Sequence, residues 1–222
     1  LVCKRQNLET ARTPSQNRDL GFLKEPLTPC PMSAASKNAA RTGEQDWAKQ
    51  PKVNGEFFAL TYGALVMQLI KDYEDILDVN KQLERMGYNI GVRLIDEFLA
   101  KSGVPTCQSH RERADVIAKV AFKMFLGVAA DVTGWNQEKN TFSLVLYENP
   151  LAEYVELPPE MNDLVYSNVL CGCIRGALEM IQIRAECKFV RDTLKGNEVN
   201  EIEVAIMEVM EEQMGDDYKD NS

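Results

Sequence analysis

Apolar and polar residues fall into regular patterns only after residue 54 of the chain. Apolar side chains recur at every third or fourth position from Phe57 to Tyr73, from Asp78 to Gly103, from Ser109 to Gly127 and from Leu164 to Met180. This spacing predicts four helices. The first of them is apolar on nearly all sides, so it needs two surfaces to pack against. The second surface is either the core of the same chain or a partner chain.

A two-residue alternation of apolar and polar side chains marks four shorter segments. They are residues 142–146, 154–157, 181–189 and 202–206. Alternation of this kind predicts strands with one face on a core. The order αααββαββ, with two hairpins, then predicts an α+β fold in which the helices pack on one face of a twisted four-stranded antiparallel sheet.

Two pairs of glycines lie inside the predicted helices. Gly87 and Gly91 fall in the second helix, and Gly172 and Gly176 fall in the fourth. A glycine inside a helix is about 1 kcal/mol less favourable than alanine. The pairs therefore predict that another element approaches closely at these positions, or that the helix bends there.

The first 52 residues differ from the rest of the chain. They hold five of the nine prolines and show no sustained apolar period, so they bury too little apolar surface to offset the entropy of ordering. We expect residues 1–52 to be disordered, with either a native start at Met32 or a processed segment before it. Residues 53–207 are expected to form the folded domain, and residues 208–222 an acidic tail.

The net charge of −9 is unevenly distributed along the sequence. Residues 198–222 hold 9 acidic and 1 basic side chains, which gives this segment a net charge of −8. An acidic chain without a basic patch is not expected to bind nucleic acid. No stretch approaches the roughly 20 apolar residues that span a bilayer, and no secretory leader is recognisable, so we expect a protein of the cytosol.

The sequence shows no pattern typical of a metal site or of a catalytic centre. It has six cysteines and a single histidine, His110, whereas a metal site needs about four convergent ligands. A nucleophile elbow and a phosphate-binding glycine loop are both missing. We therefore expect no metal, no cofactor and no enzyme activity of the chain alone. Only Cys107 and His110 lie close enough in sequence to suggest a cysteine thioesterase.

Cys107 has the most distinctive sequence surroundings. It lies two residues before Ser109, which with Glu112 forms a capping-box pattern at the start of the third helix. A helix N-terminus and the nearby Arg111 and Arg113 favour a thiolate, so the sequence predicts a lowered thiol pKa. An apolar helical stripe follows directly. Such a cysteine is either the attachment point of a thioester-linked fatty chain or an ordinary loop residue.

A series of sequence blocks in fixed order runs through residues 57–206. The blocks are residues 60–66 (LTYGALV), 78–83 (DVNKQL), 86–95 (MGYNIGVRLI), 114–124 (ADVIAKVAFKM), 149–151 (NPL), 155–158 (VELP) and 175–180 (RGALEM). They resemble the Bet-three family, the small subunits of the TRAPP vesicle-tethering complex. The resemblance implies four helices on one side of a twisted antiparallel sheet. It also implies pairing between subunits through helices, for which we expect the contact residues Phe58, Tyr62, Leu65 and Leu69.

The resemblance further implies a lipid site at Cys107. The matching cysteine of the family carries a fatty acyl (palmitoyl) chain that runs into an internal hydrophobic tunnel. The period of the third helix predicts the tunnel-lining residues Val116, Val120, Ala121 and Met124. Family members usually have a basic residue before the cysteine and a histidine after it, where this chain has Thr106 and Gln108. This departure weakens the expectation of acylation without an enzyme.

The same resemblance implies a function for the whole chain. It is expected to be a non-catalytic core subunit that works with other TRAPP small subunits and the vesicle coat to tether ER-derived vesicles at the cis-Golgi. It would act in the cytosol and on the cytoplasmic faces of cis-Golgi and ER membranes, with peripheral membrane contact only. It would also support nucleotide exchange on a Rab-family GTPase, where its acidic tail would compete for the phosphate site or the Mg²⁺. The alternative is a free lipid or acyl carrier that uses the same tunnel.

Overall fold

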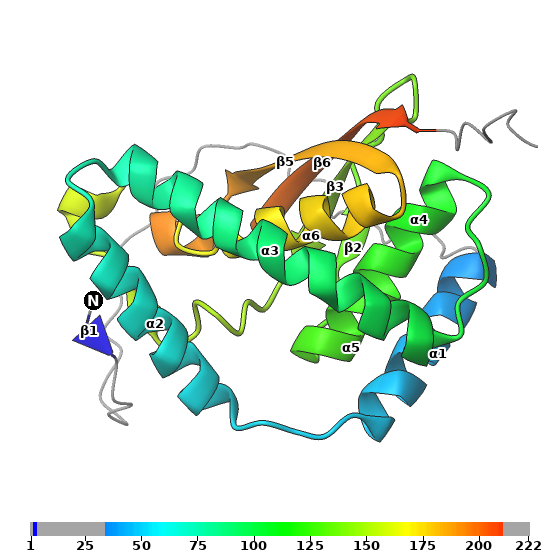
Figure 1. Ribbon diagram of the computed structural model, residues 1–222, viewed down its shortest axis with the longest axis horizontal. Helices are drawn as coiled ribbons and strands as arrows, with labels where there is room; N and C mark the ends of the chain where they lie inside the picture. The colour runs from blue at the N-terminus through cyan, green and yellow to red at the C-terminus, as the bar shows by residue number, and fades with distance from the viewer. Residues whose placement is uncertain (1, 4–33, 211–222) are drawn as a thin grey trace, which may run out of the picture.

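Figure 1 shows the computed structural model of the chain, which describes residues 2–3 and 34–210. The helices are α1 (Ala34–Lys49), α2 (Gly55–Asp72), α3 (Ile76–Ser102), α4 (His110–Val116), α5 (Phe122–Leu126) and α6 (Val169–Met180), and a π-helical turn (Ile117–Ala121) joins α4 to α5. The strands are β1 (Val2–Cys3), β2 (Asp131–Thr133), β3 (Thr141–Leu146), β4 (Val155–Glu156), β5 (Ile183–Arg191) and β6 (Asn200–Val209). Short 3-10 turns cover Pro159–Met161 and Thr193–Lys195.

A four-stranded antiparallel sheet, in the order β2-β3-β6-β5, forms one layer of the molecule. Its apolar face carries alternate residues such as Leu144 on β3 and Ile202 and Val204 on β6, and all three are fully buried. α6 packs on this face, and α3 runs along α6 (Figure 1). The predicted α+β fold with a four-stranded antiparallel sheet is confirmed.

One predicted strand does not belong to the sheet. Residues 155–156 form β4, which pairs with β1 instead of β3. The fourth strand is β2, which was not predicted from the sequence because three residues are too few to display an alternation. The predicted hairpin between residues 142–146 and 154–157 is therefore wrong, and β3 forms its hairpin with β2.

The two glycine pairs mark the contact between α3 and α6. A Cβ atom placed at Gly172 would lie 2.0 Å from the carbonyl oxygen of Glu84, and one placed at Gly87 would lie 2.0 Å from the carbonyl oxygen of Val169. Real Cβ atoms do not come this close to a backbone oxygen, so only glycine allows the two helices to touch. The predicted close approach is confirmed.

Side-chain caps fix the starts of α3 and α4. The N-cap of α3 is Asp75, and its carboxylate accepts a hydrogen bond from the Leu77 N–H at 2.9 Å. The capping pattern at α4 is confirmed. The Ser109 hydroxyl accepts from the Glu112 N–H at 3.2 Å, and the Glu112 carboxylate accepts from the Gln108 N–H at 2.8 Å. These two bonds hold the loop that precedes α4.

Residues 34–49 contradict the prediction that all of residues 1–52 are disordered. They form α1, where Asp46 is 4% exposed and Trp47 lies against Gly127. The apolar pattern missed this helix because its contact uses small residues such as Ala39 and Gly43. At the other end of the domain, β6 extends two residues past the predicted boundary at 207. The rest of the predicted extension, residues 1 and 4–33, and tail residues 211–222 lie outside the described residues.

Candidate functional site

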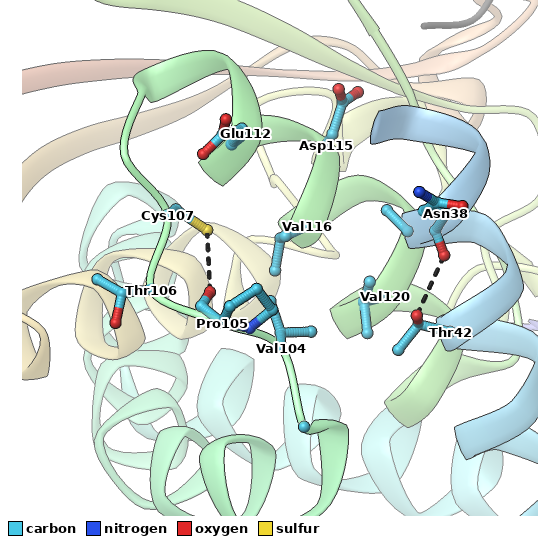
Figure 2. Close-up of a pocket in the computed structure, with 12 residues that line it drawn as sticks. Asn38, Thr42, Val104, Pro105, Thr106, Cys107, Glu112, Asp115, Val116 and Val120 are labelled. Carbon is cyan, nitrogen blue, oxygen red and sulfur yellow. Dashed lines mark hydrogen bonds between the residues drawn. The ribbon is translucent and has the colours of Figure 1, made fainter. Parts of the chain in front are cut away.

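A cavity of about 230 Å³ lies between α1, the loop of residues 103–109 and α4. Figure 2 shows Cys107 on one side of this cavity and Asn38 and Thr42 of α1 on the opposite side, with Val116 and Val120 between them. The other residues that line the cavity are Ala39, Gly103, Val104, Pro105, Thr106, Glu112 and Asp115. The structure thus places the cysteine beside a largely apolar space.

Cys107 is half-buried, and its sulfur lies 4.0 Å from the carbonyl oxygen of Pro105. Burial raises the pKa of the Cys107 thiol, and the nearby Arg113 guanidinium opposes this rise without cancelling it. The predicted lowering of this pKa is wrong, because the desolvation of a thiolate outweighs the attraction of the positive charge. Arg111 is exposed.

Arg113 is the basic residue that contacts the cysteine loop. Its Nη2 donates to the backbone oxygen of Cys107 at 3.3 Å, and its Nη1 lies 3.1 Å from Nδ1 of His110. Burial lowers the pKa of His110, and the charge of Arg113 lowers it further, so this imidazole is neutral at pH 7. The three-residue spacing of His110 and Arg113 along a helix is the sequence signal for their contact.

A small apolar cluster adjoins the cavity and is separate from the main core under the sheet. Its buried members are Ile95, Phe98, Val120 and Met124. Of the four predicted tunnel residues, Val116 and Val120 line the cavity, while Ala121 packs against the small apolar cluster and Met124 belongs to it. Val120 belongs to both the cavity wall and the cluster, so the two are continuous. The contribution of α3, through Ile95 and Phe98, was not predicted, although both lie on the apolar side of that helix.

The π-helical turn carries part of this cluster. Within it the Phe122 N–H bonds to the carbonyl of Ile117, five residues back, and the carbonyl of Ala118 instead accepts from the Ala130 N–H at 2.9 Å. π-helical turns are rare and occur frequently at functional sites. Sequence periodicity gave no sign of this turn, because one extra residue barely changes an apolar stripe.

The predicted subunit-contact residues on α2 fall into different environments. Tyr62 is buried, and its hydroxyl donates to the backbone oxygen of Tyr166 at 2.5 Å, so its assignment to a subunit interface is wrong. Leu65 and Leu69 are partly buried against the main core. Phe58 is 47% exposed and remains accessible.

Another side of α2 presents apolar side chains to the surface. Phe57 is 67% exposed and Leu60 is 56% exposed. Together with Phe58 they form the α2 patch. The helical spacing of α2 places Phe57 and Leu60 on the side opposite Tyr62. This side, and not the Tyr62 side, is available to a partner.

The other cysteines with described side chains lie in or against the main core. Burial raises the pKa of Cys173 and of Cys187 to about 12, and it also raises the pKa of Cys171. Within residues 2–3 and 34–210, no group of three His, Cys, Asp or Glu side chains is placed to hold a metal ion. No helix in the same residues has the length and hydropathy needed to cross a membrane.

Comparison with known proteins identifies a family of transport proteins to which the chain is similar. The family described as transport protein particle (TRAPP) component matches residues 58–205, and the chain belongs to this family. The chain is 54% identical to trafficking protein particle complex subunit 3 of Dictyostelium discoideum over 176 residues, 79% of this chain and 95% of that protein. It is 45% identical to the BET3 subunit of Saccharomyces cerevisiae over 182 residues, 81% of this chain and 94% of that protein.

A solved structure extends the similarity to three dimensions. It is the crystal structure of a trafficking protein particle complex subunit 3 from Naegleria fowleri covalently bound to palmitic acid. The match has a TM-score of 0.70 and 49% sequence identity, and it covers 73% of this chain and 100% of that one. The predicted membership of the Bet-three group of TRAPP subunits is confirmed.

Proposed function

We propose that this chain serves as subunit 3 of a transport protein particle and that Cys107 carries a long acyl group, such as palmitoyl, as a thioester. The observation that carries the proposal is the apolar cavity beside Cys107, which is continuous with the small apolar cluster. The palmitic acid bound to the Naegleria relative supports it. Each methylene group that an acyl chain buries contributes about 0.8 kcal/mol. The acyl chain is then buried in the core of the subunit and does not anchor the protein to a membrane.

Attachment of the acyl group is a transfer between two thiols. The Cys107 thiolate attacks the carbonyl carbon of an acyl thioester donor and forms a new C–S bond. The donor's C–S bond breaks, and the departing thiolate takes up the proton that Cys107 has lost. Because burial raises the pKa of Cys107, little thiolate is present at neutral pH and the uncatalysed transfer is slow. An acyl-transferring enzyme would remove this restriction.

The intact mass of the purified full chain tests the acylation. A thioester adds the mass of the acyl group, and neutral hydroxylamine removes it whereas organic solvent does not. Cys107→Ser should carry no added mass, and the control Cys173→Ser should keep it. A mass that disappears on solvent extraction alone would favour the free lipid carrier instead. An unmodified wild-type chain, purified from cells that contain both acyl donors and acyl-transferring enzymes, would contradict the proposal.

We also propose that the α2 patch pairs with another TRAPP small subunit. A contiguous exposed apolar surface on a water-soluble fold marks an interaction site. Phe57→Glu together with Leu60→Glu should abolish co-purification with a paralogous subunit, because the two charges would be buried without partners. Ala100→Glu, at an exposed position of α3, is the matched control. Undiminished pairing of the double variant would contradict this assignment.

Within the assembled complex, we propose that the subunit takes part in tethering ER-derived vesicles at the cis-Golgi and in nucleotide exchange on a Rab-family GTPase. It would act on the cytoplasmic face of these membranes, with the vesicle coat as a further partner. Residues 211–222 hold five acidic side chains and one basic side chain, and this negative charge supports competition for the positively charged phosphate site of the GTPase. Deleting residues 211–222 spares β6 and should slow exchange by the complex. An exchange rate equal to wild type would remove the tail from the mechanism.

A cysteine thioesterase is the less favoured activity for this site. Such an enzyme needs a histidine that takes the proton of the thiol. Among residues 34–210 no hydrogen bond joins His110 to Cys107, and Arg113 already contacts one ring nitrogen of His110. We expect His110→Ala to leave any turnover of an acyl thioester unchanged, and a loss of turnover would support the enzyme.

A further inference from the structure

α1 forms one wall of the cavity beside Cys107. Asn38, Ala39 and Thr42 line the cavity, and Figure 2 shows Asn38 and Thr42 on the side opposite the cysteine. Ala39 also packs against the small apolar cluster. The cavity is therefore closed on this side only while α1 is docked.

The docked position of α1 depends on a backbone contact at Gly43. A Cβ atom placed at Gly43 would lie 2.1 Å from the carbonyl oxygen of Lys119, which belongs to the π-helical turn. One residue further on, Glu44 pairs with Lys123 of α5 at 2.9 Å. α1 thus rests on the same helical segment that supplies Val116 and Val120 to the cavity.

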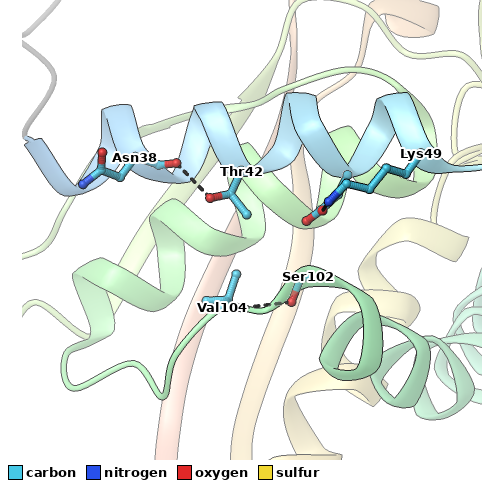
Figure 3. A network of polar contacts seen from close by, with 6 residues as sticks. Asn38, Thr42, Lys49, Ser102 and Val104 are labelled. Atoms are coloured by element: carbon cyan, nitrogen blue, oxygen red, sulfur yellow. Dashed lines mark hydrogen bonds and ion pairs between the residues drawn. The ribbon is translucent and has the colours of Figure 1, made fainter.

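Other features of α1 make its docking easy to reverse. Asp46 is buried, and one of its carboxylate oxygens has no hydrogen-bond partner in the described part of the chain, which is unfavourable. Figure 3 shows that the Thr42 hydroxyl bonds within α1, to the Asn38 oxygen at 3.1 Å, while Val104 bonds to Ser102 on the facing loop. The link from α1 to α2, residues 51–54, is exposed.

We propose that α1 is a movable wall of the acyl site. It moves away to admit the acyl chain, and the docked helix and the buried chain then stabilise each other. This inference rests on the proposed acylation of Cys107. Coupling between two binding events is reciprocal. The acyl chain therefore strengthens the docking of α1, and docked α1 strengthens the binding of the acyl chain in the cavity by the same factor.

Hydrogen exchange of the full chain tests the coupling from the side of α1. The acylated protein is compared with the same protein after treatment with neutral hydroxylamine. Amides of α1 should exchange about tenfold faster in the deacylated form, a typical size for coupled sites. Amides of α3 and α6 around their glycine contact should not change. Equal exchange of α1 in the two forms would overturn the inference.

A pair of glycine variants tests the coupling from the side of the thioester. Hydroxylamine attacks the acyl carbon through its nitrogen, the C–S bond breaks, and a hydroxamic acid and the free Cys107 thiol are formed. Gly43→Ala displaces α1 and should speed this cleavage about tenfold by exposing the site. The control is Gly55→Ala at the start of α2, where a Cβ atom would have no described atom within 4 Å.

The two variants distinguish a failure of the movable α1 wall from a failure of the proposed acylation of Cys107. Cleavage of Gly43→Ala at the wild-type rate, with the acyl group present, would overturn the movable wall and leave the acylation standing. An acyl group missing from the wild-type chain would overturn the acylation itself. Faster cleavage of both variants alike would also overturn the inference, because it would show a general loosening of the fold and no specific role for α1.

Discussion

The main core under the sheet and the small apolar cluster beside Cys107 differ in how far the protein's own side chains fill them. Leu144, Ile202 and Val204 are fully buried by the sheet and the helices of the chain itself. The small apolar cluster has four buried members and adjoins a cavity of about 230 Å³. The first region is closed by the protein alone, whereas the second leaves room for an apolar group from elsewhere. Burial of apolar side chains therefore serves stability in the main core, and in the small apolar cluster we propose that it also serves the binding of an acyl chain.

The largest expected effect separates these two regions. Leu144→Ala should lower the free energy of unfolding by about 3 kcal/mol in the acylated and the deacylated protein alike, because the cavity it leaves lies wholly within the chain. Met124→Ala should be more destabilising in the acylated form, where the lost contacts include the acyl chain. Denaturant unfolding of both forms measures this difference. An equal effect of Met124→Ala in the two forms would remove the distinction between the regions.

Sequence periodicity predicted the main core more completely than its surroundings. The alternation at residues 181–189 and 202–206 was long enough to define β5 and β6, and the glycine pairs correctly indicated the contact between α3 and α6. β2 was missed because it has three residues. α1 was missed because a helix that docks through Ala39 and Gly43 shows no stripe of large apolar side chains.

In the candidate site, too, features set by neighbouring residues were predicted, and features set by contacts between distant residues were not. The cap singled out Cys107 without deciding its role, which the family resemblance supplied, and the helical period predicted Val116 and Val120. The direction of the Cys107 pKa shift was wrong, because burial by residues far away in sequence outweighs the nearby charges. Tyr62 was assigned to the surface side of α2, whereas its hydroxyl bonds to Tyr166, which lies 104 residues away.

A larger side chain at position 121, beside the small apolar cluster, should reduce acylation of Cys107. Ala121→Leu adds three carbons beside the small apolar cluster, where Ala121 is partly buried, and should lower the acylated fraction of the purified chain severalfold. Intact mass gives this fraction directly. Ala100→Leu makes the same change at an exposed position of α3 and should have no effect. Normal acylation of Ala121→Leu would show that the acyl chain does not pass this residue.

The reactivity of the deacylated Cys107 thiol should follow its raised pKa. The thiolate is the reactive form, so alkylation at pH 7 should be slower than for an exposed cysteine and should continue to rise above pH 9.0. Arg113→Ala removes the opposing positive charge and should slow alkylation further, by about threefold. Arg111→Ala should leave the rate unchanged. A rate that levels off below pH 9.0 would contradict the raised pKa.

The smallest expected effect concerns α2. Tyr62→Phe removes the hydrogen bond to the Tyr166 oxygen and should lower the free energy of unfolding by about 1 kcal/mol. Pairing with a partner subunit should be unchanged, because Tyr62 is buried within the chain. Denaturant unfolding and co-purification give the two readings. Loss of pairing with unchanged stability would return Tyr62 to the interface.

The central claim is that an acyl chain on Cys107 fills the space beside the small apolar cluster. The most direct measurement is the nuclear Overhauser effect between the protons of the acyl chain and the ¹³C-labelled methyl groups of Met124, Val120 and Leu144 in the full acylated protein. All three residues are buried, and Met124 is 2% exposed. We predict cross-peaks from the acyl chain to Met124 and Val120 and none to Leu144 in the main core. Acyl protons that contact neither Met124 nor Val120 would contradict the account.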